Sequence, residues 1–287
     1  MRMSRHWIRC FAAGSLAAAA LLPGRDAGAQ EVSLPFRPGE ELIYRSKLGR
    51  LSGSGKGVMR VEADTIRSSN AYLLSFDFET RVGPLRLEAR SRSWLDPERM
   101  AALRFHKHER HPLASKTEEV ELYPAERRWR SAEGREGRSE TDAPLDELSF
   151  LYYIRTLDLR DGAAYVIERH FDPQRNPVHV EVLGRERATV PAGVFDVVVV
   201  EMRVRDRDHF DGDGSFRLYL TDDARRYPVR LETSASIAGK AILELEAAIP
   251  ARSAPAARVA RGNWSPRSRP LPSRRSRGRR WRRSRPY

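Results

Sequence analysis

The chain has 287 residues and carries 52 Lys and Arg against 39 Asp and Glu, which gives a formal net charge of +13. Residues 251–287 contain 13 Arg and no acidic residue, and residues 1–29 contribute +3, so residues 30–250 carry −3. Domains that read DNA keep an excess of Lys and Arg on their folded surface. The charge distribution therefore argues against specific nucleic-acid binding by the body of the chain.

The N-terminal residues have the three-part pattern of a secretory signal peptide. Residues 1–9 are basic, residues 11–22 are uncharged and rich in Ala and Leu, and residues 27–29 are small. Small residues are what signal peptidase accepts before the bond that it cleaves. We expect a signal peptide over 1–29, cleavage before Gln30, and export to the periplasm or cell envelope. A short N-terminal anchor helix is the alternative.

Cleavage would leave a mature chain without cysteine, because Cys10 is the only one. Disulfides, thiol catalysis and Cys-ligated zinc are then excluded together. After residue 30 the sequence has no apolar run of the roughly 18 residues or more that a membrane-spanning helix needs. We therefore expect a mature protein that does not span the membrane.

Two stretches of the body, about 41–132 and 164–248, alternate apolar and polar residues with a period of two. In 85–92, for example, Leu87 and Ala89 alternate with Glu88 and Arg90. This alternation is typical of half-buried antiparallel strands, since successive side chains point to opposite faces. The run 194–200 is β-branched and apolar on both faces, which favours a more central strand.

Turn residues separate these strands. Pro191 and Gly193 predict a tight connection after Val190. Ser68, Ser69 and Asn70 are expected to form another turn. The glycines between Gly49 and Gly57 fail the spacing of a phosphate-binding loop, so we expect a flexible hairpin turn there.

A single helix is predicted at about 143–157, between the two strand-rich stretches. Thr141 or Asp142 can cap it, and Pro144 suits its first turn. Its apolar residues cover too much of its surface for a helix with one exposed face. We therefore predict a single all-β domain over 30–250, mainly antiparallel. It should form a curved sheet or a β-barrel-like domain with one buried or capping helix.

Four stretches, in order, resemble an exported bacterial family of unknown function, family 3108. They are FRPGEELIY at 36–44, DELSFLYYIRTL at 146–157, the segment 181–196 and LYLTDDARRYPV at 218–229. The motif positions are Phe36, Pro38, Gly39, Glu40, Tyr44, Phe150, Tyr152, Tyr153, Arg155, Pro191, Gly193, Phe195, Asp222, Asp223, Arg225 and Pro228. The resemblance implies a β-rich envelope domain and brings with it no catalytic residue and no cofactor.

The best metal candidate is the group His106, His108 and His111. On a strand, His106 and His108 share a face at about 6.5–7 Å along the chain, and three imidazoles could chelate Zn²⁺ or Cu²⁺. The competing interpretation is a solvated polar strand face, since the neighbours are charged. No cofactor is expected.

Asp222 and Asp223 are adjacent carboxylates beside Arg225. Neighbouring residues on a strand point apart, so the two make a poor acid–base pair unless a turn reorients them. The favoured interpretation is a turn with local ion pairing. The sequence also contains no Gly-x-Ser-x-Gly elbow. Nothing in it points firmly to an enzyme.

Arg, Ser and Pro dominate residues 251–287, which are expected to be disordered because they have no core-forming pattern. Such a tail would attract polyanions, including nucleic acid or anionic lipid. A frame-shifted extension would give the same composition, and the mass of the intact protein distinguishes the two.

The leading hypothesis is a non-enzymatic envelope domain that binds a lipid or other apolar ligand, or scaffolds an envelope partner protein. One-sided apolar alternation together with an apolar helix can enclose a pocket. One alternative is an envelope hydrolase or metal-dependent enzyme, with His106, His108 or Asp222 lining a cleft. The other is a polyanion binder that acts through the basic tail.

Overall fold

A computed structural model of the chain describes residues 34–48, 53–82, 84–111, 114–205, 213–233 and 241–251. The predicted signal peptide and all of the predicted tail after residue 251 lie outside the described residues. In the described part, no helix has the length and apolar character to cross a membrane.

In the described residues, fourteen strands form one sheet, and every neighbouring pair in it is antiparallel. The strands are β1 Glu41–Leu48, β2 Gly53–Ile66, β3 Ser69–Val82, β4 Leu85–Asp96, β5 Ala101–His111, β6 Ala114–Tyr123, β7 Arg128–Ser131, β8 Glu136–Arg138, β9 Ala164–Ile167, β10 Val178–Val190, β11 Gly193–Arg205, β12 Asp213–Thr221, β13 Pro228–Thr233 and β14 Ala241–Ile249. This confirms the predicted all-β class and both strand-rich stretches.

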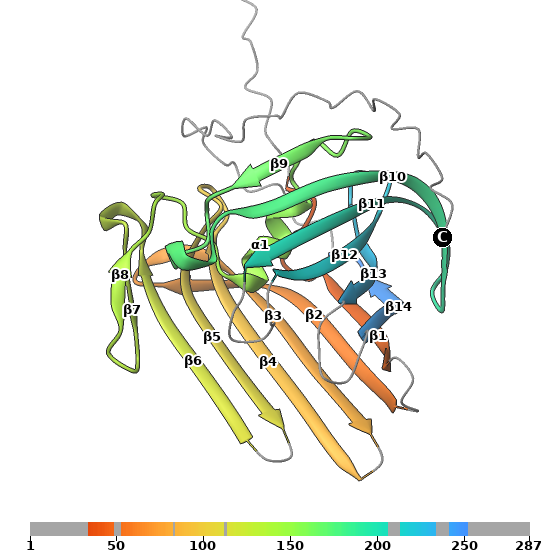
Figure 1. Cartoon of the computed structure of the whole chain (residues 1–287), viewed down its shortest axis with the longest axis horizontal. Helices are drawn as coiled ribbons and strands as arrows, with labels where there is room; N and C mark the ends of the chain where they lie inside the picture. Colours follow the sequence, from red (N-terminus) through yellow and green to blue (C-terminus); the bar gives the residue numbers. More distant parts are fainter. Residues whose placement is uncertain are drawn as a thin grey trace, which may run out of the picture. The chain divides into compact units, whose positions relative to one another are not determined.

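The sheet is an up-and-down meander whose first and last strands pair at its centre. Its order is β8-β7-β6-β5-β4-β3-β2-β1-β14-β13-β12-β11-β10-β9, so β8 and β9 are its edges. The segment between these edge strands carries α1, Glu147–Ile154. In Figure 1, α1 lies between the long strands β2–β6 and the strands β10–β12. The helix therefore packs inside the curved sheet, as predicted.

Alternation along the strands divides the sheet into an apolar inner face and a charged outer face. Val178, Val180 and Val182 are buried, whereas the residues between them are exposed. In β11, which was predicted to be a more central strand, Val197–Val200 are all buried, and Val194 is 59% exposed. The strand lies in the interior of the sheet between β12 and β10, third from the β9 edge. The core lies on the inner face, around α1.

The helix is shorter than the predicted 143–157, and the predicted caps are wrong. Asp146 caps it: its Oδ1 accepts hydrogen bonds from the backbone N–H groups of Leu148 and Ser149, each 2.9 Å long. Upstream, the Pro144 carbonyl accepts from Ala102 N at 2.7 Å, and Leu145 N donates to Arg169 O at 2.6 Å. These tertiary hydrogen bonds hold the preceding residues extended, so helix formation starts later.

The first of the predicted turns lies earlier in the chain than expected. The β2–β3 turn is Arg67–Ser68, both at positive φ, so Asn70 belongs to β3, where it pairs with Thr65. The Pro191–Ala192 turn between β10 and β11 is as predicted.

Gly53–Gly57 belongs to β2 and is not a flexible turn, while residues 49–52 lie outside the described part. Gly55 pairs with Thr80 of β3. A Cβ on Gly55 would lie 2.5 Å from the Glu79 carbonyl oxygen and 2.6 Å from Thr80 Cβ. The glycine is therefore explained by close packing between two strands.

Candidate ligand-binding cavity

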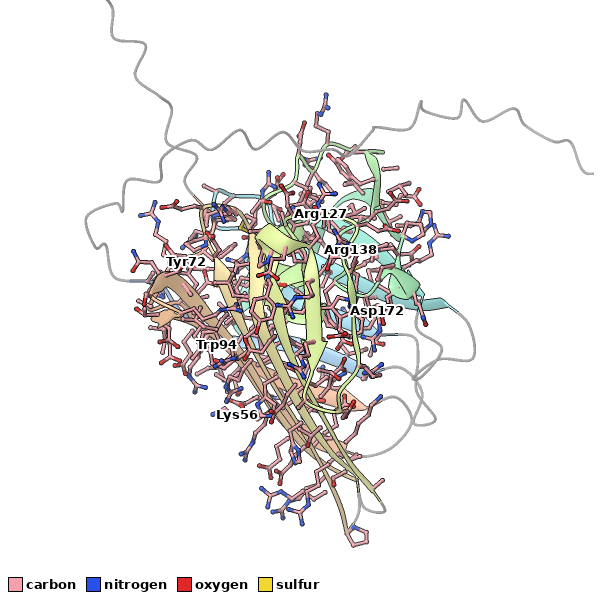
Figure 2. All side chains as sticks on the ribbon, turned by 90° about the vertical axis from the view of Figure 1, so that its left-hand side faces the viewer. Lys56, Tyr72, Trp94, Arg127, Arg138 and Asp172 are labelled. Atoms are coloured by element: carbon pink, nitrogen blue, oxygen red, sulfur yellow. The ribbon has the colours of Figure 1, made fainter. Side chains whose placement is uncertain are left out.

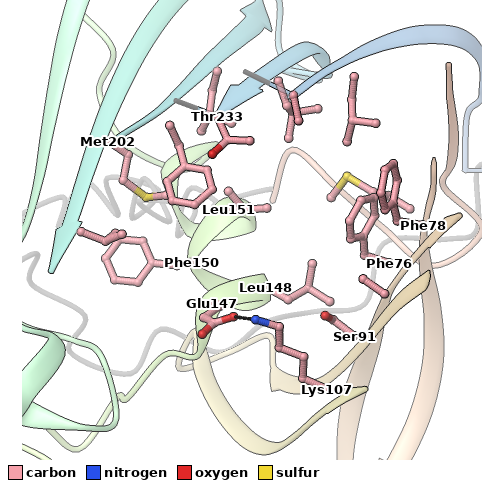
Figure 3. A pocket seen from close by; sticks show the side chains of 18 of the residues that line it. Phe76, Phe78, Ser91, Lys107, Glu147, Leu148, Phe150, Leu151, Met202 and Thr233 are labelled. Atoms are coloured by element: carbon pink, nitrogen blue, oxygen red, sulfur yellow. Dashed lines mark hydrogen bonds and ion pairs between the residues drawn. The ribbon is translucent and has the colours of Figure 1, made fainter. Parts of the chain in front are cut away.

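A cavity of about 460 Å³ lies between α1 and the inner faces of both parts of the sheet. Among the described residues, fifteen apolar ones line it: Met59, Phe76, Phe78, Ala89, Leu148, Phe150, Leu151, Val178, Met202, Val204, Phe216, Leu218, Leu231, Ala241 and Leu243. This size falls in the range of about 300–1,000 Å³ that is typical of small-molecule sites. Figure 3 shows Phe76 and Phe78 on one wall, Met202 on another, and the α1 residues between them.

The apolar walls follow directly from the alternation of the strands. Phe76 and Phe78 of β3 are two residues apart and therefore share a face, as do Met202 and Val204 of β11. From α1, Leu148 and Leu151 are three residues apart and lie on one side of the helix. The helix thus supplies apolar side chains between the two walls.

One part of the cavity lining is polar and ionic. Lys107 Nζ lies 2.9 Å from Glu147 Oε2 and 3.1 Å from Glu109 Oε1. The other oxygen of Glu147, Oε1, accepts a hydrogen bond from Arg175 Nη1 at 2.5 Å. Arg175 belongs to the short 3₁₀ helix η2, Pro173–Arg175. The Glu147 carboxylate is therefore paired on both oxygens, and Figure 3 shows its contact with Lys107.

These contacts set the ionisation of the group. Burial alone would raise the pKa of Glu147, but Lys107 and Arg175 lower it to about 2. Burial alone would lower the pKa of Lys107, but Glu147 and Glu109 raise it well above its ordinary value. Both side chains are thus charged at neutral pH and form a compensated ion pair.

His170 lines the cavity beside this ion pair and is 4% exposed. Asn176 holds its backbone in place: His170 N donates to Asn176 Oδ1 at 2.9 Å, and Asn176 Nδ2 donates to His170 O at 3.2 Å. Burial, followed by the positive charge of Arg175, lowers the pKa of His170 to about 4. The imidazole is therefore neutral at pH 7.

His170 Nε2 is a buried polar atom for which the described residues provide no hydrogen-bond partner. The ring's other nitrogen, Nδ1, lies 3.1 Å from Asp172 N and 3.2 Å from Asp172 O. The ring also contacts the ring of Phe171 at a tilt of 32°, with centroids 4.6 Å apart. The position of Nε2 is thus fixed by its surroundings.

His106 and His108 of the predicted histidine group lie on the opposite face of the sheet. His106 Nε2 is 3.4 Å from Glu119, and His108 Nδ1 is 2.9 Å from Thr117 Oγ1. The side chain of His111 lies outside the described residues. No group of three or more potential metal ligands occurs among the residues that the structure describes.

The outer face around these histidines is charged. Arg92 and Arg60 contact Asp77 at 2.8 and 3.4 Å, across neighbouring strands. In Figure 2, the label of Lys56 marks β2 and the label of Trp94 marks β4. Neither His106 nor His108 lines the cavity, so the two do not share a cleft with the ionic group inside.

Asp222 and Asp223 are used locally and point to different partners. Asp222 Oδ2 contacts Arg185 Nε at 2.8 Å. Asp223 Oδ1 accepts from Thr221 Oγ1 at 2.7 Å and from two backbone N–H groups of its own turn. Arg225 Nη2 lies 2.8 Å from Asp223 Oδ2. Neither aspartate lines the cavity.

Several of the sixteen motif residues meet around a buried ion pair. Arg155, directly after α1, contacts both oxygens of Glu40 at 2.7 and 2.9 Å, and the side chains are 1% and 4% exposed. The same guanidinium donates to Pro35 O and Arg225 O. Its carbon lies 5.3 Å from the ring centre of Tyr152. This cluster fastens the N-terminal segment and the β12–β13 turn to the end of α1.

The other motif residues lie in strands, turns or the helix. Phe36 packs edge-on against Tyr152, Tyr44 Oη donates to Pro228 O at 2.8 Å, and Gly39 has a φ of +95°. Pro38 precedes β1, Tyr153 is buried in α1, Pro191 lies in the β10–β11 turn, and Gly193 and Phe195 lie in β11. Of the whole set, Phe150 alone lines the cavity.

The family model described as a protein of unknown function, DUF3108, matches residues 44–246. The chain belongs to this family. The match spans β1 to β14, and hence almost every strand and the whole of α1. None of the curated proteins matches this DUF3108 chain.

One solved structure with a TM-score above 0.5 is similar in fold to the DUF3108 chain. A β-barrel-like protein of domain of unknown function DUF1849 from Brucella abortus has a TM-score of 0.51 at 10% identity, covering 76% of this chain and 99% of that one. Two other matches have lower TM-scores. A candidate lipoprotein from Parabacteroides distasonis scores 0.28 at 12% identity, covering 75% and 98%. A candidate exported protein with a YmcC-like fold from Bacteroides fragilis scores 0.30 at 14%, covering 75% and 97%.

Sequence reasoning missed the polar cavity residues Lys107, Glu109, His170 and Arg175 of this DUF3108 chain. A usable indication was present in β5. If His106 and His108 face outward, then Phe105, Lys107 and Glu109 must face inward by strand alternation. An inward lysine and glutamate on one strand require buried partners. No comparable pattern marks His170, whose position depends on Asn176 and Leu145.

Proposed function

We propose that this DUF3108 chain is a non-enzymatic binding protein of the cell envelope whose inner cavity holds an apolar ligand. The observation that carries the proposal is the cavity of about 460 Å³ between α1 and the sheet, with its fifteen apolar lining residues. Apolar surface released from water on binding supplies the driving force for such a ligand. Envelope localisation follows from the predicted signal peptide.

Cavity binding should be measured on the full-length chain with N-phenyl-1-naphthylamine, an uncharged dye whose fluorescence rises in apolar surroundings. Saturable binding is expected. Ala89→Trp, on the inner wall of β4, should abolish or strongly weaken it by filling the cavity. Arg90→Trp is the matched control, because the next residue of the same strand points to the outer face.

A second substitution, Met202→Trp on the opposite wall, guards against a local folding defect in Ala89→Trp. Circular dichroism and thermal melting should show that the variants fold. Native mass spectrometry of the wild type should reveal a co-purified small molecule. Equal dye binding by the wild type and both cavity variants would rule out the proposal.

A further inference from the structure

Two residues that line the cavity each have a buried polar atom without a hydrogen-bond partner among the described residues, His170 Nε2 and Ser46 Oγ. His170 Nε2 is buried, and the described part of the chain offers it no hydrogen-bond partner. A buried donor or acceptor without a partner costs free energy, and a ligand that pairs with it recovers that cost. An occupant of the cavity is therefore expected to carry a polar group at the His170 end.

The surrounding charges disfavour a charged group on the ligand. Glu147 is paired on both oxygens, with Lys107 and with Arg175. Lys107 in turn contacts Glu109 as well as Glu147. A free carboxylate or ammonium group would have to leave water for a buried region whose charges already pair with one another, and it would bring a charge without a counter-charge of its own. The polar group that fits is uncharged.

The volume favours a single chain. At about 30 Å³ per water-sized group, 460 Å³ holds roughly fifteen such groups. A methylene group is close to a water molecule in volume. A single acyl chain of ordinary length therefore matches the volume of the cavity.

We propose that the cavity takes a single-chain amphiphile whose uncharged, hydroxyl-bearing head hydrogen-bonds to His170 Nε2, as in a long-chain alcohol or a monoacylglycerol. This inference rests on the proposed function. A hydroxyl can both donate and accept. It therefore pairs with Nε2 whichever ring nitrogen carries the proton, given that Nδ1 lies near both Asp172 N and Asp172 O.

The ligand class should be tested by displacement of N-phenyl-1-naphthylamine from the full chain at pH 7, below the critical micelle concentrations. The competitors are monolauroylglycerol, lauric acid and dodecylamine, which share one chain length and differ in head group. Monolauroylglycerol should displace the dye at the lowest concentration. An equal or stronger effect of the acid or the amine would overturn the inference.

The role of His170 should be tested with two conservative variants. His170→Asn keeps a polar atom near the position of Nδ1 but removes the group at Nε2, and should weaken monolauroylglycerol binding about tenfold. His170→Gln, whose amide reaches the Nε2 position, should retain most of the affinity. His108→Asn, on the outer face, is the control and should have no effect.

The outcomes separate the two proposals. If the dye itself does not bind the wild type, the proposed apolar cavity function fails. If the dye binds but the three head groups compete equally, or His170→Asn binds monolauroylglycerol as the wild type does, only the head-group inference fails. Water alone would then be the partner of His170.

Discussion

Replacing Glu40 by Gln should destabilise the protein strongly, because the substitution leaves Arg155 charged and buried. The two carboxylate oxygens lie 2.7 and 2.9 Å from the guanidinium, and both side chains are almost completely excluded from solvent. Gln keeps the shape of Glu but removes the counter-charge. It also turns one acceptor into an amide that faces another donor.

The expected cost is about 3–5 kcal/mol, the usual range when one partner of a buried ion pair is removed. For a domain of this size, each kcal/mol lowers the Tm by about 2–4 °C. Glu40→Gln should thus lower the Tm by roughly 6–20 °C. The contacts of Arg155 with Pro35 O and Arg225 O favour the upper half of the range, since they hold the guanidinium in place.

Thermal and urea unfolding followed by circular dichroism will measure this cost. Asp196→Asn is the matched control: its partner Arg187 lies 3.3 Å away, but the side chains are 76% and 73% exposed. That exposed pair should contribute less than about 1 kcal/mol. The double variant Glu40→Leu, Arg155→Met should be less destabilised than the sum of its single variants. Equal costs for Glu40→Gln and Asp196→Asn would refute the reasoning.

Three further predictions concern stability. The pKa of His170 is about 4 in the folded chain and 6.5 in the unfolded chain, so acidification through this window should remove up to about 3 kcal/mol. His170→Asn should lack this loss relative to the wild type in urea titrations from pH 7 to pH 4. Burial raises the pKa of Asp146 to about 6 with the opposite sign, but Asp146 is present in both proteins and cancels in the comparison. Asp146→Ala should cost about 2 kcal/mol by removing the helix cap, whereas Asp142→Ala, at an exposed position, should change the urea midpoint little. Gly55→Ala should cost about 1–3 kcal/mol in thermal melts because its Cβ would collide with β3, and an unchanged Tm would show that the strands can separate there.

The strands were predictable because their alternation is a local property of the sequence. Leu87 and Ala89, and likewise Val178 and Val180, fall on the inner face as their spacing requires. The start of the helix was not predictable in the same way. Thr141 and Asp142 are good caps by residue type. Hydrogen bonds from Ala102 N to Pro144 O and from Leu145 N to Arg169 O nevertheless hold the chain extended as far as Leu145.

The sequence predicted that an apolar cavity exists, but it did not predict which polar and charged residues line that cavity. One-sided strands and an apolar helix indicated an enclosed apolar space. The pairing of Lys107 with Glu147 joins residues that are 40 positions apart, and Arg175 comes from a third segment. Spacing along the chain carries no information about such contacts. His106 and His108 were predicted as part of a metal site because they are close in sequence, although their side chains face away from the cavity.

The pairing of β1 with β14 determines when the fold can be completed. Each half of the sheet is a series of hairpins between neighbours in sequence, which can form as the chain emerges. The two halves join only when Leu48 meets Ala241 and Glu41 meets Ile249. Such distant contacts form late and slow the folding of a domain. A chain shortened before β14 would lack the strand that joins the two halves, with the inner edges of β1 and β13 unpaired and prone to aggregation.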